Sequence, residues 1–395
     1  MRRIGICCLI VLLLFCGCAA PSRGAEESAV NVGASGGVWL SFSEINTMLK
    51  SKDGVKAEFE KVVQNCASLQ IEHLYIHVRA FCDSLFESEY FPLIEAMNGI
   101  DFDVFAYMIE RCHASGMKVH AWINPYRVST STEDITVLRQ DSPAVRWRTD
   151  DDPDNDQNVI TYGGGVYLNP AEYEVQELVM NGIREILEKY PVDGIHFDDY
   201  FYPTTDEAFD SKSYQAYQKS GENPLPLAEW RRSNVNALIS GSYTAVKFYN
   251  KELLFTVSPM ASIEKNYDNL YADVAGWVES GCVDAIIPQL YFGYEYPDKA
   301  YCFDRLLKEW ETLAAKNRNV ALMIGLAPYK IGTESEPDRA EWGVSDDILA
   351  RQVETCYTDG AVTGYSFFSY TSLFSQEALN TRQRENVKKA IRANT

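Results

Sequence analysis

Residues 193–200 read DGIHFDDY, a short apolar run that begins after a glycine and ends in two consecutive carboxylates. Successive side chains of a β-strand point to opposite faces, so Ile195 and Phe197 share one face, and His196 and Asp198 share the other. In a parallel barrel the outward face packs on helices, and the C-terminal ends of the strands carry the ligand site. The pattern therefore predicts a barrel strand with its apolar residues outward and its polar residues toward the barrel mouth.

The two residues that close this stretch are less tightly constrained. Tyr200 belongs to the face of Asp198, whereas Asp199 starts on the opposite face. Asp199 can join Asp198 in one site if the backbone turns directly after the strand. The alternative is that Asp199 caps the segment that follows.

Strand-like and helix-like segments alternate along the rest of the chain. Eight short runs are rich in apolar, β-branched or aromatic residues: Val38–Phe42, His73–Arg79, Lys118–Asn124, Gly194–Tyr200, Leu253–Ser258, Ala285–Tyr291, Ala321–Ala327 and Gly364–Ser369. Eight windows have apolar residues at helical spacing: Lys56–Leu69, Phe102–Ser115, Glu172–Lys189, Leu227–Asn250, Tyr271–Ser280, Asp298–Asn317, Asp346–Thr358 and Gln376–Ile391. This order predicts an α/β fold, a single (β/α)8 TIM barrel with long βα loops over residues 36–395. A doubly wound open sheet is the alternative, but no glycine-rich fingerprint follows the first strand.

The first 35 residues have the composition of a targeting segment and a tether. A short basic region precedes an apolar stretch too short to span a bilayer, and a glycine stands directly before Cys18, as in a bacterial lipobox. We expect a signal peptide with lipobox over residues 1–18, lipidation of Cys18, and a flexible tether over residues 19–35. The expected location is the cell envelope, at the outer membrane or cell surface, with the lipid anchor as the membrane contact. Ordinary secretion with cleavage near Ala20 is the alternative.

Composition narrows the class of partner. The 395-residue chain has a formal net charge of −20, which argues against nucleic acid because phosphate binding needs clustered Lys and Arg. The sequence contains no Cys-x-x-Cys pair or zinc-finger spacing, and we predict neither a metal nor a cofactor. The acidic run at residues 150–156 predicts a solvated turn, with calcium binding as the alternative. Six cysteines follow the leader, and disulfides or buried thiols both fit them: Cys66, Cys82, Cys112, Cys282, Cys302 and Cys356.

Polar side chains gather at the predicted C-terminal ends of several strands. They include His77, Arg79, Asn124, His196, Asp198, Gln289 and Tyr291. Taken singly, each has a structural explanation, such as an ion pair between Arg79 and Asp83. Because the ends of parallel strands meet at one rim of a barrel, the set as a whole favours a ligand site. A carboxylate held beside an imidazole is the group that glycosidic-bond hydrolysis requires.

Several motifs, in this order along the chain, resemble the glycosyl hydrolase-like 10 family. They are HVRAF (77–81), HAWINPYR (120–127), YLNP (167–170), DGIHFDDYFYP (193–203), PQLYF (288–292) and SFFSYTSL (366–373). The resemblance implies a (β/α)8 barrel and an exported glycoside hydrolase, since some lipoprotein members are implicated in cleaving peptidoglycan glycan strands. It implies that Asp198 and Asp199 are the acidic pair. Substrate would then contact His77, Arg79, Asn124, Tyr126, Arg127, His196, Tyr200, Gln289 and Tyr291.

These inferences predict a glycoside hydrolase that acts on a bacterial cell-wall or surface polysaccharide of the N-acetylated type. Asp198 is expected to be the general acid or the nucleophile, and Asp199 the second carboxylate. An acetamido group of the substrate is the alternative to a second carboxylate. A rival of another class is a non-catalytic surface glycan-binding barrel. A metal-dependent hydrolase is disfavoured, because the cationic Arg79 lies two residues from His77 where a metal-binding pair would need a second ligand.

Overall fold

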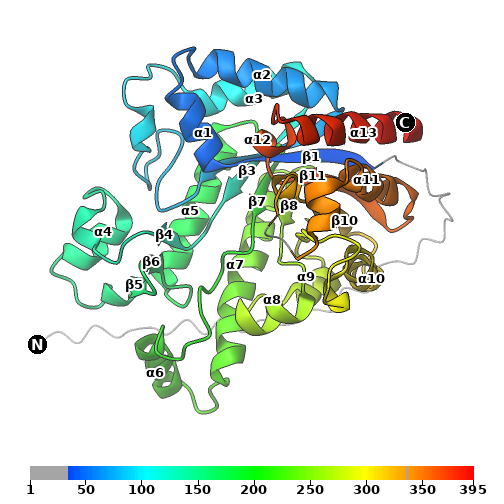
Figure 1. The fold of residues 1–395 in the computed structure, drawn as a ribbon. Coiled ribbons are helices and arrows are strands. Elements are labelled where there is room, and N and C mark those ends of the chain that lie inside the picture. The colour runs from blue at the N-terminus through cyan, green and yellow to red at the C-terminus, as the bar shows by residue number, and fades with distance from the viewer. Residues whose placement is uncertain (1–33, 335–336) are drawn as a thin grey trace, which may run out of the picture. The chain divides into compact units, whose positions relative to one another are not determined.

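The computed structural model describes residues 34–334 and 337–395, which form a parallel barrel surrounded by helices (Figure 1). The predicted signal peptide, the Cys18 lipobox and most of the predicted tether lie outside the described residues. Within the described part of the chain, no helix is long and apolar enough to cross a membrane.

The barrel closes in the strand order β1-β11-β10-β9-β8-β7-β3-β2, and all its neighbouring strands are parallel. The strands are β1 (Ser35–Leu40), β2 (Ile71–Arg79), β3 (Lys118–Ile123), β7 (Gly194–Phe197), β8 (Leu254–Val257), β9 (Ala285–Ile286), β10 (Ala321–Leu326) and β11 (Val362–Phe367). The predicted (β/α)8 TIM barrel is therefore confirmed.

Helices connect consecutive strands and cover the outside of the barrel (Figure 1). They are α1 (Phe42–Leu49), α2 (Val55–Ser68), α3 (Val104–Ala114), α4 (Pro143–Thr149), α5 (Tyr173–Lys189), α6 (Ser211–Ser220), α7 (Leu227–Tyr249), α8 (Ile263–Asn269), α9 (Val274–Ser280), α10 (Phe303–Ala314), α11 (Ile348–Thr358), α12 (Tyr370–Leu373) and α13 (Ala378–Asn394). The shorter helices α1, α4, α6, α8 and α12 lie outside the windows that periodicity predicts, because a helix of two turns shows too few repeats of the pattern.

The long loop after β3 contains structure that the sequence pattern did not predict. It forms an antiparallel sheet in the order β4-β6-β5, from β4 (Arg127–Ser129), β5 (Val159–Tyr162) and β6 (Gly165–Leu168). Gly163 and Gly164 join β5 to β6 with φ angles of 58° and 85°. A two-residue hairpin turn with two positive φ angles is the geometry that Gly-Gly favours. The loop therefore presents a folded wall at the rim.

Strand β9 is much shorter than the predicted run Ala285–Tyr291, since it ends at Ile286. Pro288 follows, and proline has no N–H group to donate to a neighbouring strand. Past the proline, Gln289 makes isolated bridges with Met260 and Gly325. The chain therefore stays beside its neighbours at the rim without the regular alternation of a strand.

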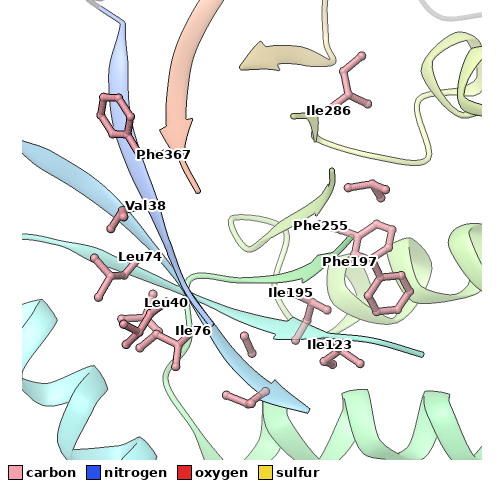
Figure 2. Close-up of a cluster of buried hydrophobic side chains, with 14 of the residues drawn as sticks. Val38, Leu40, Leu74, Ile76, Ile123, Ile195, Phe197, Phe255, Ile286 and Phe367 are labelled. Carbon is pink, nitrogen blue, oxygen red and sulfur yellow. The ribbon is translucent and has the colours of Figure 1, made fainter. Parts of the chain in front are cut away.

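A layer of apolar side chains fills the space between the strands and the helices. Figure 2 shows outward-facing residues of this layer, among them Leu74, Ile195, Phe197 and Phe255, all of them fully buried. Burying one such side chain contributes about 1.5–3 kcal/mol to stability. The predicted outward direction of Ile195 and Phe197 is confirmed.

The inside of the barrel is aromatic and polar. Trp39, Tyr75, Trp122, Ile287 and Met323 form a second buried cluster. Four buried histidines contact this cluster: His73, His77, His120 and His196. The Tyr75 ring stacks on His120 at 4.8 Å between centroids, and His73 Nδ1 and His120 Nε2 share a hydrogen bond of 2.9 Å. Several polar tips in this core form hydrogen bonds to one another, whereas His120 Nδ1 has no hydrogen-bond partner among the described residues.

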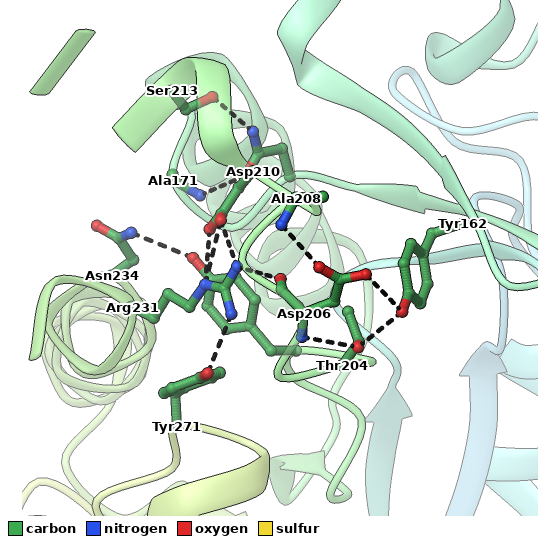
Figure 3. Close-up of polar contacts among 12 residues, drawn as sticks. Tyr162, Ala171, Thr204, Asp206, Ala208, Asp210, Ser213, Arg231, Asn234 and Tyr271 are labelled. Carbon is green, nitrogen blue, oxygen red and sulfur yellow. Dashed lines mark hydrogen bonds and ion pairs between the residues drawn. The ribbon is translucent and has the colours of Figure 1, made fainter. Parts of the chain in front are cut away.

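A buried ion pair anchors the loop after β7 to helix α7 (Figure 3). The side chains of Arg231 and Asp210 are both fully buried. Arg231 donates to the Asp210 carboxylate through both Nε and Nη2. Arg231 also donates to the backbone oxygen of Asp206 at 2.8 Å and to the Tyr271 hydroxyl at 3.0 Å. A buried charge with every hydrogen bond satisfied fixes one geometry, and removing one partner is strongly destabilising. The loop that leaves β7 is therefore held in place.

The six cysteines of the described residues are free thiols, and all but Cys282 are buried. Disulfides do not contribute to the described fold.

The buried histidines make stability depend on pH. Burial lowers the pKa of His73 to about 4 and that of His196 to about 3, and it holds the pKa of His120 well below its usual value. In the unfolded chain these groups take up protons near pH 6.5. Between about pH 6.5 and pH 4 the unfolded state therefore binds more protons, and we expect the free energy of unfolding to fall as the pH is lowered through this range.

Urea denaturation from pH 7 to pH 5 measures this slope. His73→Gln should flatten this slope. A urea midpoint that does not change over this range would contradict the assignment of neutral buried histidines.

Candidate active site

The end of strand β7 brings both candidate carboxylates into one cavity. The strand ends at Phe197. The backbone N–H of Phe201 donates to the backbone oxygen of Asp199 at 3.1 Å, which closes a tight turn. This turn redirects Asp199, so that it and Asp198 both line a cavity of about 350 Å³ at the barrel mouth. The cavity is lined by Trp39, Ser41, Phe42, His77, Trp122, Arg127, Asp198, Asp199, Tyr200, Ser258, Gln289, Tyr291, Tyr329 and Phe368.

Two side chains at the end of β3, the strand next to β7, hold the Asp198 carboxyl. Trp122 on β3 donates its indole N–H to Asp198 Oδ2 at 3.0 Å. Asn124, just beyond β3, satisfies both neighbours when its amide nitrogen faces Asp198, at 2.6 Å from Oδ1, and its oxygen accepts from His77 Nε2 at 3.1 Å. His77 lies on β2, so a chain of hydrogen bonds runs from β2 through β3 to the end of β7. Asp198 is 4% exposed.

The electrostatic environment favours a protonated Asp198. Burial raises the pKa of Asp198 to about 8, the charge of Asp199 adds to this rise, and the Arg127 cation opposes it. Burial also raises the pKa of Asp199, while a hydrogen bond from the Gln289 side chain lowers it. Asp198 therefore holds its proton near neutral pH beside a second carboxyl group, and a buried protonated carboxyl is the group that general acid catalysis needs.

Aromatic rings form much of the cavity wall. The His77 ring stacks on Trp122, with 3.7 Å between centroids and 10° between the planes. Phe368 meets Trp122 edge-on at 6.4 Å, Tyr291 stacks on Phe368 at 6.0 Å, and Tyr329 meets Tyr291 edge-on at 5.7 Å. Such rings offer flat apolar faces, and their polar tips can hydrogen-bond to a ligand.

Arg127 supplies a positive charge at the edge of the cavity. Its guanidinium lies 4.2 Å from the centre of the Tyr200 ring and 5.0 Å from that of Phe81. Tyr200 is 49% exposed. The pair therefore forms an accessible rim beside the carboxylates.

The structure places five of the predicted contact residues on the cavity wall: His77, Arg127, Tyr200, Gln289 and Tyr291. Asn124 is buried behind Asp198 and acts on it directly. The prediction that His196 lines the cavity is wrong, because it lies one layer deeper inside the barrel. His196 Nε2 accepts from the Trp39 indole at 3.0 Å, and its Nδ1 donates to Thr256 Oγ1 at 2.8 Å. His196 therefore supports Trp39, which does reach the cavity.

Arg79 and Tyr126 lie outside the cavity, contrary to their predicted positions. The pairing of β2 with β3 shifts register between His77 and Arg79, which turns Arg79 away from the face of His77. The guanidinium instead lies 3.7 Å from the centre of the Phe91 ring, and its nitrogens make no hydrogen bond among the described residues. Tyr126 is buried in the outer core, where its hydroxyl accepts from Gln176 Nε2 at 3.1 Å.

The cavity residues that the sequence pattern did not single out include Trp39, Ser41, Phe42 and Tyr329. Trp39 on β1 lies two residues before Ser41, which also lines the cavity. Alternation of strand faces puts both residues on one face and could have identified Trp39. Tyr329 lies in the short 3-10 turn Pro328–Lys330 after β10, and Phe42 begins α1, so neither shows a periodic signal. Among the described residues, no group of three or more His, Cys, Asp or Glu side chains is arranged to hold a metal ion.

The outward position of Arg79 leads to a prediction about stability. A β-carbon at Gly182 of α5 would lie 2.5 Å from Arg79 Nη1 and 2.7 Å from the Phe91 ring. Gly182→Ala should therefore lower the free energy of unfolding by about 1–3 kcal/mol through overpacking. In the double variant with Arg79→Met, whose flexible apolar side chain can give way, most of this loss should be recovered.

Urea denaturation of the two single variants and the double variant measures the coupling. Strictly additive effects would contradict the packing of Arg79 against α5.

The parallel barrel and the carboxylates at its mouth place the protein among the glycoside hydrolase-like TIM barrels. The glycosyl hydrolase-like 10 family model matches residues 35–343, and the chain belongs to this family.

Two curated relatives carry the name glycosyl hydrolase. YngK of Bacillus subtilis (strain 168) is 31% identical over 348 residues, which is 80% of this chain and 65% of YngK. The chain thus spans somewhat less than two thirds of that relative. DigH of Escherichia coli (strain K12) is 29% identical over 432 residues, covering 98% of this chain and 95% of DigH.

A solved structure has a similar fold. The PgaB (BpsB) glycoside hydrolase domain from Bordetella bronchiseptica superposes with a TM-score of 0.60 at 14% identity, covering 91% of this chain and 99% of that chain. At this identity the similarity shows the fold.

Proposed function

We propose that the protein is a glycoside hydrolase of the bacterial cell envelope that cleaves an N-acetylated polysaccharide of the cell wall or cell surface. The observation that carries this proposal is the pair Asp198 and Asp199 in one aromatic-walled cavity, with the pKa of Asp198 raised to about 8 by burial. Membership of the glycosyl hydrolase-like 10 family supports the same reaction class. The lipobox at Cys18 supports a lipid-anchored location in the envelope.

In this mechanism Asp198 is the general acid. Its proton passes to the glycosidic oxygen while the bond from that oxygen to the anomeric carbon breaks, so the leaving sugar departs with a hydroxyl group. The negative charge of Asp199 stabilises the oxocarbenium-like transition state. Water then gives its hydroxyl to the anomeric carbon, and its remaining proton restores the protonated pair.

The surrounding residues prepare this step. Trp122 and Asn124 fix the Asp198 carboxyl by hydrogen bonds, so little rearrangement is needed when the proton leaves. The rings of Tyr291 and Phe368 offer surfaces for a sugar ring. Gln289 orients Asp199 through its side-chain hydrogen bond.

Replacement of the proposed acid tests the reaction directly. Asp198→Asn should lower kcat on purified peptidoglycan glycan strands by about 10²–10⁴-fold, because general acid catalysis supplies a factor of this size. The matched control is Asp151→Asn in the exposed acidic run, which should retain full activity. Circular dichroism and thermal unfolding establish that both variants fold.

Near-normal release of reducing ends by Asp198→Asn would refute its role as the acid. A folded wild-type protein that binds these strands and releases no product would instead favour the non-catalytic glycan-binding barrel.

The charge of Arg127 should set the alkaline limit of activity. The pH dependence of kcat/KM reports the pKa values of groups in the free enzyme. We therefore expect kcat/KM to fall above about pH 8, as Asp198 loses its proton. The Arg127 cation lowers the pKa of Asp198, so Arg127→Gln should move the alkaline limb of the pH profile to higher pH. Arg127→Lys keeps the charge and should leave the limb close to its original position. A downward shift in Arg127→Gln would exclude this electrostatic arrangement.

A further inference from the structure

The cavity that contains Asp198 and Asp199 adjoins further cavities, with which it shares lining residues. A neighbouring cavity of about 380 Å³ shares Phe42 and His77 with it. That neighbour in turn shares Phe81, Asp83, Leu138 and Arg139 with another cavity, of about 240 Å³. We call these two neighbouring cavities together the loop arm, because their walls come mainly from the loops after β2 and β3.

A cavity of about 240 Å³ also adjoins the catalytic cavity on the side of Asp199. It shares Asp199, Gln289, Tyr291 and Tyr329 with the catalytic cavity. We call it the β9 arm, because Gln289 and Tyr291 follow strand β9. The carboxylates therefore lie between two flanking spaces and not at the closed end of a pocket.

The loop arm has the chemistry of a surface for hydroxylated ligands. The rings of Phe42 and Phe81 meet edge-on at 5.2 Å where the arm leaves the catalytic cavity. Beyond them the lining contains Asp83 and Arg139, with hydroxyl groups from Ser129, Thr130, Ser131 and Ser142. An apolar ring surface followed by hydrogen-bond donors and acceptors, with one cation and one carboxyl group among them, suits a largely neutral sugar chain.

The β9 arm repeats this combination with other residues. Lys265 lies 4.7 Å from the centre of the Tyr301 ring, and Lys330 lies 5.3 Å from that of Phe292. Ser262 adds a hydroxyl group to the same lining. Aromatic surface and polar groups are therefore present on both sides of the acidic pair.

The walls of the loop arm are fixed before any ligand binds. Strand β4 pairs with β6. The backbone N–H of Leu168 donates to the backbone oxygen of Tyr126 at 2.8 Å, which connects the inserted sheet to the segment that directly follows β3. Arg139 is held by Asp141 through hydrogen bonds of 2.9 Å and 2.6 Å. A preformed surface binds without a large ordering cost, so contacts made in the arm can contribute to affinity.

We propose that these cavities form one continuous glycan-binding groove, and that the protein binds its polysaccharide through units on both sides of Asp198 and Asp199 and cleaves it at internal bonds. This inference rests on the proposed hydrolase function for its cleavage step. The groove itself is a binding property, which can be tested without turnover.

The binding test uses Asp198→Asn, which removes cleavage, and N-acetylglucosamine oligomers and peptidoglycan glycan strands of increasing length as probes. Affinity measured by calorimetry should rise with chain length beyond the shortest oligomer that binds. Thr130→Trp places a bulky ring at an exposed position of the loop arm and should lower the long-to-short affinity ratio by roughly tenfold. Thr244→Trp, on the exposed surface of α7, is the matched control and should leave this ratio unchanged.

The product test follows fragment sizes with time in the active protein. Internal cleavage gives fragments of intermediate length from the start, and Thr130→Trp should lower kcat/KM on long strands relative to short ones. Affinity that is independent of length for both probe series, or release of terminal units alone from the first time point, would overturn the groove. Length-dependent binding without any product would leave the groove standing and refute the hydrolase function instead.

Discussion

The burial of one carboxyl group at the barrel mouth is the constraint on which the site depends. Removing a carboxylate from water is costly unless hydrogen bonds or a proton compensate, and Asp198 has both. Its donors, Trp122 and Asn124, belong to the strand next to β7, and the histidine that orients Asn124 belongs to the strand beyond. The buried carboxyl group of Asp198 therefore has its hydrogen-bond partners because closure of the barrel places β7, β3 and β2 side by side.

The barrel separates two kinds of packing that serve different purposes. Outside the strands, aliphatic and phenyl side chains hold the helices in place. Inside, Trp39, His196 and Thr256 form a hydrogen-bonded layer directly below the cavity. This layer keeps the cavity floor rigid. Its hydrogen bonds require the neutral form of the His196 ring, so protonation of the ring in acid disfavours the folded state that supports the site.

The loops at the rim are built as firmly as the barrel that carries them. The inserted sheet β4-β6-β5 forms a wall beside the mouth, and the buried pair of Arg231 and Asp210 anchors the loop that leaves β7. Long loops without such internal structure would be mobile and would lose affinity through ordering. Here the rim presents folded surfaces on both sides of the carboxylates, which is the arrangement that the proposed groove requires.

The sequence by itself determined the architecture and the central residue. Alternation of strand and helix patterns gave the closed barrel, and alternation within residues 193–200 separated the outward Phe197 from the inward Asp198, because both patterns are local properties of the backbone. Tertiary structure decided the rest. A register shift against β3 turned Arg79 outward, and a tight turn after β7 brought Asp199 into the cavity. Depth along the barrel axis placed His196 below the site. The end of a strand, its register against its neighbour and the level of a side chain along the barrel axis all depend on hydrogen-bond partners in neighbouring strands. These partners are distant in sequence.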